Sequence, residues 1–327
     1  MRVLVTGGSG FIGSHVVDRL RSDGHEPVIF DLAASRHHPP TEVRTILGDI
    51  ADRDAARRAV HECDVIIHLA AVADVGEVVS DPFHADRTNV HGTQVILDAA
   101  RHDGIERVLY GSTVWVYGDA LAKPPLDEDA ALVLPAHLYT ATKLAGEMYC
   151  RSYSALYGAS HTILRFGIPY GPRARLAAVV PSFVARAQEG KALTISGDGR
   201  QTRQFVYVED LAAGIVAALA REAENRVYNL VGAEQTSVHE IADTVREVVA
   251  PVPIVHGPER PADAHIAQIS GARARDELGW QPVTPFVDGV RRYVEWLAET
   301  SDSPLAETAS MMDGTAATVL RQEPTEL

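Results

Sequence analysis

A tyrosine and a lysine four residues apart form the pair of side chains whose types and spacing most directly suggest chemistry. They are Tyr139 and Lys143, in the stretch LYTATKLAGE. Residues four apart share one face of a helix, so the phenol and the ammonium would be neighbours. A free tyrosine has a pKa of about 10, and lowering it by roughly 3 units takes about 4 kcal/mol of stabilisation of the phenolate by nearby positive charge. The pair could therefore exchange a proton with a substrate, although an amphipathic surface helix can show the same spacing by accident.

The stretch GSTVWVYG, residues 111–118, brings two adjacent hydroxyls, Ser112 and Thr113, to the end of an apolar run. A hydroxyl at this place could hydrogen-bond a reacting oxygen, or the run could simply be a buried strand that enters a turn. Val114 and Trp115 follow directly, and neither side chain can take up a proton. The stretch therefore offers a hydroxyl without a carboxylate beside it.

A glycine-rich turn near the N-terminus supplies binding chemistry. The stretch TGGSGFIG places Gly7, Gly10 and Gly13 between a predicted strand and a predicted helix. Glycines there permit a tight turn and let the backbone approach a pyrophosphate, whose charge the helix N-terminus stabilises. Together with Phe11 and Ile12 they predict a dinucleotide-binding turn, and a glycine turn required only for packing is the alternative.

Asp31 closes the second predicted strand, 18 residues after Gly13. A carboxylate at this place hydrogen-bonds the ribose 2′-OH of NAD and repels the 2′-phosphate of NADP, so NAD is the favoured cofactor. Arg36 lies nearby in the sequence, and a solvated strand end is the other interpretation of Asp31.

Two further stretches follow in the order that a dinucleotide site requires. Asp49 could hydrogen-bond the adenine amine while Ile50 covers the adenine ring. The fourth predicted strand ends in Leu69, Ala70 and Ala71, where the backbone would pass close to the cofactor. Each stretch alone is ordinary, and their order supports the prediction.

Apolar runs and amphipathic segments alternate through the first half of the chain. The predicted strands are 2–7, 27–31, 44–48, 64–70, 107–112 and 161–166, and the predicted helices are 11–22, 52–61, 86–103 and 139–157. This alternation predicts an α/β fold, a Rossmann-type doubly wound parallel sheet with helices on both faces. Later in the chain we expect helices at 178–190 and 211–221, strands at 193–197, 205–210 and 226–232, and a helix opened by the capping box Ser237-x-x-Glu240.

The chain divides by pattern into two predicted domains. Residues 1–166 are expected to form an NAD-binding Rossmann domain, to which segments near 205–232 return. Residues 167–300 are expected to form a smaller α/β C-terminal substrate-binding domain, and 301–327 a disordered tail. The acidic stretch 127–129 is interpreted as a solvated loop.

The overall composition excludes several classes of protein. The formal net charge of −14 disfavours nucleic acid as a partner. No apolar run approaches the roughly 18 residues of a membrane span and no signal peptide is apparent, so we expect a cytoplasmic protein without membrane contact. Cys63 and Cys150 lie far apart without CxxC spacing, which indicates reduced thiols. The pair His37-His38 is interpreted as part of an exposed loop, and no metal site is expected.

Together, these motifs resemble the extended short-chain dehydrogenase/reductases, specifically the nucleotide-sugar epimerase/dehydratase family and its UDP-glucose 4-epimerase-like members. The resemblance covers residues 2–297 and rests on TGGSGFIG, Asp31, GDI, HLAA, NVHGT, GSTVWVYG, the tyrosine–lysine pair and RQFVYVED. It implies that Tyr139 is the acid/base and that Lys143 binds the nicotinamide ribose and tunes the tyrosine. It also implies that Thr113 bonds the reacting sugar oxygen, with Ser112 as a structural neighbour.

The resemblance also implies a reaction. Epimerases of the family oxidise a sugar carbinol and reduce the ketone again from its other face, whereas dehydratases and decarboxylating members typically carry a carboxylate one or two positions after the threonine. Val114 and Trp115 occupy those positions here. We therefore predict NAD-dependent epimerisation of a nucleotide-diphosphate sugar at C4, through a transient 4-keto intermediate. A 4-ketosugar reductase and a non-catalytic NAD-binding sensor protein are the alternatives.

Three arginines are candidates for the substrate site. Arg203 and Arg260 match family arginines that clamp the diphosphate. Arg173 and Arg175 lie in the neighbourhood in which an arginine of some uronate-acting relatives meets the sugar carboxylate, so the substrate could be a UDP-hexose or a UDP-hexuronate. Two loop arginines in solvent are the alternative, as a solvated side chain is for Arg203 and Arg260. Ile168 stands where the family usually has an asparagine that orients the sugar nucleotide. The apolar faces of 86–103 and 139–157 could pack on a second subunit, as in many relatives, and a homodimer is expected.

Overall fold

The central strands form where the sequence places its apolar runs. The computed structural model describes residues 1–118, 125–135, 137–258 and 267–301. Within these ranges one seven-stranded sheet has the order β11-β6-β5-β4-β1-β2-β3, and all of its pairings are parallel. Its strands are β1 (Arg2–Thr6), β2 (Glu26–Asp31), β3 (Thr45–Leu47), β4 (Val65–His68), β5 (Arg107–Thr113), β6 (Ser160–Phe166) and β11 (Arg226–Leu230). The strand order reverses between β1 and β4, and this is where open α/β sheets bind ligands at the carboxyl ends of their strands.

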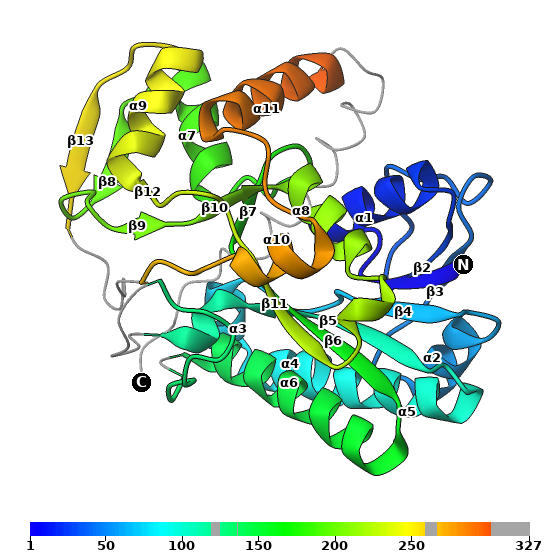
Figure 1. Cartoon of the computed structure of the whole chain (residues 1–327). Helices are drawn as coiled ribbons and strands as arrows, with labels where there is room; N and C mark the ends of the chain where they lie inside the picture. Colours follow the sequence, from blue (N-terminus) through cyan, green and yellow to red (C-terminus); the bar gives the residue numbers. More distant parts are fainter. Residues whose placement is uncertain (119–124, 136, 259–266, 302–327) are drawn as a thin grey trace, which may run out of the picture.

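Helices cover both faces of this sheet (Figure 1). On one face lie α1 (Phe11–Ser22) and α8 (Val208–Ala217), and on the other lie α2 (Arg53–Val60), α5 (Thr93–Asp103) and α6 (Leu138–Tyr157). Val3 and Val5 of β1 face the first cluster of apolar side chains and Leu4 faces the second, because side chains alternate along a strand. The Rossmann-type doubly wound α/β fold predicted from the sequence is confirmed.

Smaller elements from the second half of the chain lie beside this sheet. Two-stranded pairs are formed by β7 (Ile168–Tyr170) with β10 (Phe205–Tyr207), β8 (Leu193–Ser196) with β13 (Ile254–Gly257), and β9 (Thr202–Arg203) with β12 (Thr236–Ser237). Helices α7 (Val179–Gln188), α9 (Val238–Val248) and α11 (Phe286–Ser301) gather with them at one end of the molecule (Figure 1). The division at residue 166 into two domains stays a prediction, and the predicted tail 302–327 lies outside the described residues.

Short helices connect these elements. They are α3 (Val75–Ser80), α4 (Pro82–Asp86), the 3-10 helices η2 (Val114–Tyr117) and η3 (Arg221–Ala223), and α10 (Ala272–Leu278). The helix predicted at 86–103 is instead composed of the end of α4, a π-helical segment η1 (Arg87–Gly92) and α5. The strand predicted at 205–210 ends at Tyr207, because Glu209 and Asp210 stabilise the first turn of α8. The capping box of Ser237 and Glu240 at the start of α9 is confirmed.

Two stretches interpreted as solvated loops contain buried side chains, so those interpretations are wrong there. The imidazole of His38 is buried, and lies 2.7 Å from an Asp18 carboxylate oxygen and 3.2 Å from the Ser35 hydroxyl. Glu128 is buried and accepts the backbone N–H of Asn229 at 2.7 Å. Polar side chains are expected at the surface, but they can be buried where the fold gives them hydrogen-bond partners.

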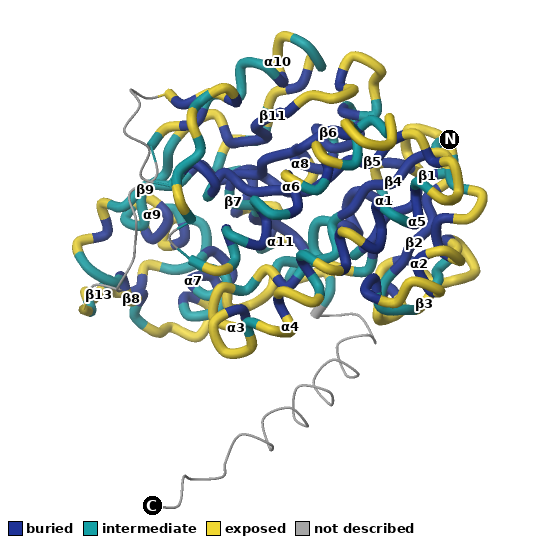
Figure 2. The backbone as a smooth tube through the Cα atoms, turned by 90° about the horizontal axis from the view of Figure 1, so that it is seen from below, coloured by how far each residue is buried: buried dark blue, intermediate teal, exposed yellow. Residues whose placement is uncertain are grey.

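Burial follows the layers of the fold (Figure 2). The strands of the central sheet are mostly buried, and exposed residues gather in outer loops and at helix ends. Within the described part of the chain, no helix is both long enough and apolar enough to span a membrane.

Candidate active site

The glycine turn after β1 lies against the chain that leaves β4. Gly7 has a φ of 70°, and a Cβ there would come within 2.8 Å of the Ala70 backbone nitrogen. A Cβ on Gly13 would collide with the carbonyl oxygen of Gly7. Side chains are therefore excluded from both positions, and the turn stays narrow enough for its backbone to approach a ligand.

Helix α1 begins in this turn with no side chain capping its first N–H groups. Gly10 is the N-cap residue, and no acidic residue lies in the first turn. Gly10 is exposed, while Phe11 and Ile12 are half-buried. The partial positive charge of an uncapped helix N-terminus suits a pyrophosphate. The residues present at the end of β1 therefore fit the dinucleotide that the sequence predicts.

Asp31, at the end of β2, is hydrogen-bonded to the glycine turn. Its carboxylate accepts the backbone N–H of Ser9 at 3.0 Å and that of Ala33 at 3.4 Å. The Ser9 hydroxyl donates to the Ala33 carbonyl at 2.8 Å. Asp31 thus lies beside the turn, next to the expected ribose. Ser9 also belongs to this part of the candidate cofactor site, and the sequence analysis did not identify it.

The predicted adenine contacts have protein partners of their own. Asp49 accepts a 2.7 Å hydrogen bond from the Arg87 guanidinium and a 2.8 Å bond from the Ala51 N–H. Ile50 is 4% exposed and packs under Gly92, where a Cβ would come within 2.7 Å of the isoleucine Cδ1. Ile50 therefore belongs to the core. Arg87, which sequence reasoning did not single out, is more than half exposed and pairs with Asp49.

A buried chain of hydrogen bonds positions Leu69 and Ala70. Their backbone N–H groups donate to the Thr6 hydroxyl at 3.1 and 3.2 Å, and that hydroxyl lies 2.7 Å from His68 Nδ1. His68 Nε2 lies 2.9 Å from the Thr93 hydroxyl. Burial lowers the pKa of His68 to about 3, so the imidazole is neutral and can accept through one nitrogen and donate through the other.

The next residues of the same loop are attached to α6 through Asn89. The Asn89 side chain accepts the Val72 N–H at 2.8 Å and donates to the Val72 carbonyl at 2.9 Å and the Thr142 hydroxyl at 3.0 Å. The Thr142 hydroxyl donates in turn to the carbonyl of Tyr139 at 2.8 Å. The loop that holds Ala71, which is half-buried, is therefore fixed relative to the helix that carries the tyrosine.

Lys143 connects α6 to β5. Its Nζ donates to the Gly111 carbonyl at 2.9 Å and lies 5.2 Å from the centre of the Tyr110 ring. Lys143 is buried, and burial lowers its pKa to about 8. Because Gly111 precedes Thr113 by two residues and Lys143 follows Tyr139 by one helical turn, the contact brings the two candidate segments together.

Tyr139 is half-buried, and its ring packs on Val72 and Val78. Burial raises the pKa of its phenol to about 12, and the positive charge of Arg175 opposes that rise. The protein groups alone therefore do not lower the pKa of Tyr139, as Lys143 and the positive nicotinamide together were expected to do. The lysine ammonium is bonded to a carbonyl of β5, and burial outweighs the neighbouring charges.

The two hydroxyls of GSTVWVYG have different environments. Ser112 is buried and donates a 2.6 Å hydrogen bond to the Glu147 carboxylate. Thr113 is the last residue of β5, and its hydroxyl accepts the Trp115 N–H at 3.3 Å at the start of η2. Ser112 is thus engaged inside the protein, and Thr113 is the hydroxyl at the carboxyl end of the strand.

Glu147 belongs to a buried ion pair below these hydroxyls. Arg165 donates to both of its carboxylate oxygens, at 3.0 and 2.7 Å, and to the Tyr117 hydroxyl at 2.8 Å. The Tyr117 hydroxyl donates to the Asn229 side chain at 2.8 Å. Two charges buried away from water need hydrogen-bond partners. Here Glu147 comes from α6, Arg165 from β6 and Tyr117 from η2, so the ion pair joins three elements.

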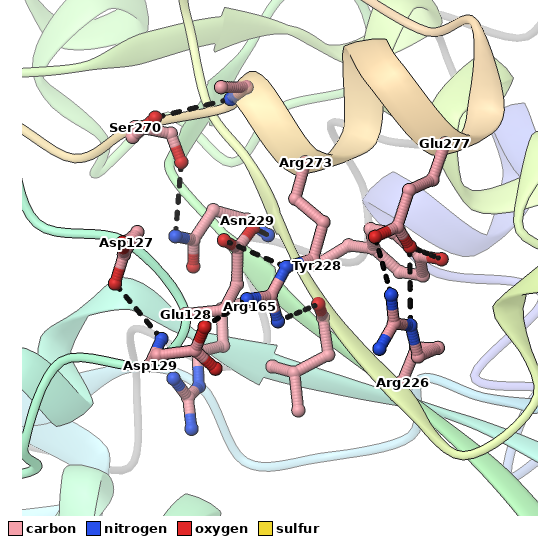
Figure 3. A network of polar contacts seen from close by, with 12 residues as sticks. Asp127, Glu128, Asp129, Arg165, Arg226, Tyr228, Asn229, Ser270, Arg273 and Glu277 are labelled. Carbon is pink, nitrogen blue, oxygen red and sulfur yellow. Dashed lines mark hydrogen bonds and ion pairs between the residues drawn. The ribbon is translucent and has the colours of Figure 1, made fainter.

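The same network continues outward from β11 (Figure 3). The Asn229 amide donates to the Ser270 carbonyl at 3.1 Å, and its backbone N–H donates to Glu128. Arg273 pairs with Glu128 at 3.6 Å and also with Asp129. These bonds fasten two loops of the described chain, around 126–129 and 267–271, to the central sheet.

The predicted substrate arginines lie in three different situations. Arg203, in β9, holds its guanidinium 5.4 Å from the centre of the Trp115 ring and donates to the Thr202 carbonyl at 2.7 Å. Arg175 pairs with Asp74 at 2.6 Å and is more than half exposed. Arg260 lies outside the described residues.

A cavity of about 720 Å³ opens at the opposite edge of the sheet. Residues at or beside the amino ends of the strands line it, among them Met1, Asp64, Arg107 and Ser160. It contains none of the predicted site residues, and ligands of such sheets bind at the carboxyl ends. In the part of the chain that the structure describes, no group of three His, Cys, Asp or Glu side chains could hold a metal ion.

Comparison with known proteins agrees with this geometry. Residues 3–231 match the model of the NAD dependent epimerase/dehydratase family. The chain is 35% identical over 314 residues to a UDP-glucose 4-epimerase of Mycolicibacterium smegmatis, covering 92% of this chain and 100% of that one. It is 31% identical over 318 residues to a UDP-N-acetyl-alpha-D-glucosaminuronate decarboxylase of Bacillus cytotoxicus, covering 91% and 98% of the two chains. Its fold matches the crystal structure of the UDP-glucose 4-epimerase of Thermus thermophilus in complex with NAD, with a TM-score of 0.83, 32% identity, and 90% and 98% of the chains covered.

The protein has the architecture of an extended short-chain dehydrogenase/reductase. This architecture combines a doubly wound parallel sheet, a glycine turn at the switch point, and a helix, α6, that carries the tyrosine and the lysine. The chain belongs to the NAD dependent epimerase/dehydratase family, and its cofactor is NAD. Both the resemblance and the cofactor predicted from the sequence are confirmed.

Proposed function

We propose that the protein epimerises a nucleotide-diphosphate sugar at C4 through a transient 4-keto intermediate. The observation that supports this reaction over elimination is the pair of residues after Thr113. Val114 is buried and apolar, and Trp115 carries an indole, so neither can remove a proton from a second sugar carbon. Bound NAD would supply the hydride acceptor and return the same hydride to C4.

We infer three catalytic roles from the arrangement of α6 and β5. Tyr139 moves the proton of the C4 hydroxyl, Thr113 hydrogen-bonds the same oxygen, and Lys143 anchors the nicotinamide ribose. The Lys143 contact with Gly111 supports these roles, because it holds the tyrosine helix against the strand that ends in the threonine. The chain alone keeps Tyr139 a neutral phenol, the form that donates a proton to a ketone oxygen.

The cofactor contacts are proposed from the order of the loops at the switch point. The glycine turn binds the pyrophosphate, Asp31 the adenosine ribose, the 49–50 segment the adenine, and the loop after β4 the nicotinamide half. The residues are Gly7, Gly10, Phe11, Ile12, Gly13, Asp31, Asp49, Ile50, Leu69, Ala70, Ala71, Tyr139 and Lys143.

The substrate contacts are proposed from the three arginines. Arg203 and Arg260 would clamp the diphosphate with their planar guanidinium groups. Arg175 would meet the carboxylate of a hexuronate, and its electrostatic effect on Tyr139 supports a position near the reacting carbon. Arg175 pairs with Asp74, which brings its guanidinium beside α3. A UDP-hexose and a UDP-hexuronate are therefore the two substrate classes to compare.

The experiment is to incubate the purified protein, without added cofactor, with UDP-, dTDP- and GDP-sugars, and to analyse the products by NMR. Interconversion of C4 epimers supports the proposal. Conversion of a 4-ketosugar only with added NADH or NADPH would identify a reductase instead. Retention of NAD with no product from any sugar would favour a sensor protein.

We also propose that the protein is a cytoplasmic homodimer. Exposed apolar side chains on α4 and α6 support an interface, since Phe83 is 84% and Leu156 72% exposed. Cys63 and Cys150 form no disulfide, as in a reducing compartment. Light scattering gives the mass in solution, and a monomer would contradict the dimer.

A further inference from the structure

Four side chains from three parts of the chain form a row that ends at Tyr139. The His137 ring is stacked with the Tyr139 ring, their centroids 6.4 Å apart and their planes 15° from parallel. The Trp115 ring meets the His137 ring edge-on at 5.2 Å. The Arg203 guanidinium lies 5.4 Å from the centre of the Trp115 ring. The row therefore leads from the proposed diphosphate contact to the proposed acid/base.

Trp115 is the least buried residue between Gly111 and Tyr117, and it packs at the edge of an apolar cluster that includes Leu126 and Ile269. Every other residue from Gly111 to Tyr117 is buried, whereas Trp115 is half-buried. Its backbone N–H donates to the Thr113 hydroxyl at 3.3 Å, so the start of η2 is joined to that hydroxyl. An apolar aromatic face thus stands where an eliminating enzyme would need a proton acceptor.

His137 is held in one tautomer by the start of α6. It is the N-cap residue, and its Nδ1 accepts the backbone N–H of Thr140 at 3.4 Å. The proton of the neutral ring is then on Nε2. Burial lowers the pKa of the imidazole, which keeps it neutral at pH 7. The Thr140 hydroxyl lies 3.1 Å from Nδ1 and 3.3 Å from Nε2, so its shorter contact is with the nitrogen that caps the helix.

This tautomer decides what His137 can do. A general base needs a free lone pair, and the Nδ1 lone pair is used by the cap. The ring can therefore donate a hydrogen bond and present its face, and it does not substitute for the absent carboxylate.

We propose that Trp115 and His137 form the wall of the sugar subsite and determine which sugar is accepted. The C–H face of the sugar ring packs on the indole, and the His137 Nε2–H donates to a sugar hydroxyl. The inference rests on the proposed function for its ligand class, because Arg203 places the diphosphate at one end of the row and Tyr139 places C4 at the other.

The test separates the sugar from the nucleotide. Affinities are measured by calorimetry, with NAD present, for UDP-glucose, UDP-glucuronate, dTDP-glucose and GDP-mannose, and for UDP, dTDP and GDP alone. His137→Ser keeps an N-cap acceptor but removes the ring, so α6 retains its start. Trp115→Ala removes the aromatic face and Trp115→Phe keeps part of it. His102→Ser, on the exposed end of α5, is the matched control.

We expect His137→Ser and Trp115→Ala each to raise the Kd of the preferred nucleotide sugar by about tenfold. The Kd of its nucleoside diphosphate should not change in His137→Ser. Trp115→Phe, which keeps an aromatic face beside Arg203, should have a smaller effect than Trp115→Ala. Unchanged sugar-nucleotide affinity in both variants would overturn the inference. So would a wild-type protein that binds no sugar nucleotide more tightly than the corresponding diphosphate. The test measures binding and not turnover. If the variants lost sugar affinity but the wild type epimerised no sugar, the proposed function would be wrong and the proposed sugar subsite would still be supported.

Discussion

The ammonium of Lys143 lies 2.9 Å from the carbonyl oxygen of Gly111, and this contact joins the helix that carries Tyr139 to the strand that ends in Thr113. The lysine is buried and its pKa is lowered to about 8, so it is a charge that the fold holds at a cost. A group kept at such a cost is a common mark of a functional site. The relationship leads to the first prediction.

Lys143→Met should abolish turnover without loss of stability at pH 7. The folded pKa of about 8 lies below the ordinary value of 10.5, so the native state binds fewer protons than the unfolded state between these values. The stability of the wild type should therefore rise relative to the variant as the pH increases from 8 to 10. Urea titrations at pH 7, 8.5 and 10 measure this difference. A variant that is much less stable at pH 7 would contradict the assignment.

Tyr139→Phe should lower kcat by about 100- to 10,000-fold while the purified protein keeps its NAD. The substitution removes only the hydroxyl, and the half-buried ring can still pack on Val72 and Val78. Tyr149→Phe, on the same helix, serves as the control and should behave as wild type. Turnover is followed by chromatography of the nucleotide sugars. If turnover survived unchanged, the acid/base would have to be another group.

Glu147→Leu should destabilise the fold by about 3–5 kcal/mol, because it leaves the Arg165 guanidinium buried without its carboxylate. The double variant Glu147→Leu/Arg165→Met should recover most of that loss, since both charges are then absent. Equilibrium unfolding in urea measures the four proteins of this cycle. A loss in the double variant equal to the sum of the losses in Glu147→Leu and Arg165→Met would mean that the pair is not coupled.

His161→Phe should stabilise the protein in mild acid. The imidazole is buried, neither ring nitrogen has a hydrogen-bond partner among the residues that the structure describes, and burial lowers its pKa to about 4. Its folded pKa lies below the unfolded value of 6.5, so its protonation favours unfolding as the pH falls from 6.5 towards 4. His15 and His68 stay in both proteins, so the difference in melting temperature between pH 7 and pH 5 isolates His161. An equal acid shift in both proteins would show that His161 already has a partner in solution.

The sequence was sufficient for features that depend on local pattern. The strands, the glycine turn and the capping box of α9 follow from periodicity and from residue type within a few positions. Asp31 could be placed because it ends a strand next to the turn.

Features that depend on distant partners could not be predicted in this way. Glu128 reads as a loop residue until Asn229, 101 positions away, donates to it. Arg87 meets Asp49 across 38 positions, and nothing local marks that pair. The pKa of Tyr139 was expected to fall through the combined charges of a lysine one turn away and the positive nicotinamide, and the protein groups alone do not lower it. Burial, which depends on tertiary packing, raises it instead. His137 was missed because its role depends on a ring contributed by Trp115.

The most direct test of C4 epimerisation is the fate of a deuterium placed at C4 of the nucleotide sugar that the protein accepts. Incubation without added cofactor, followed by NMR of the product, locates the label. Deuterium retained at C4 in both epimers, without exchange into solvent or release in a reduced cofactor, is the result that we predict. Deuterium found at C6, or lost from the sugar into free NADH, would contradict it.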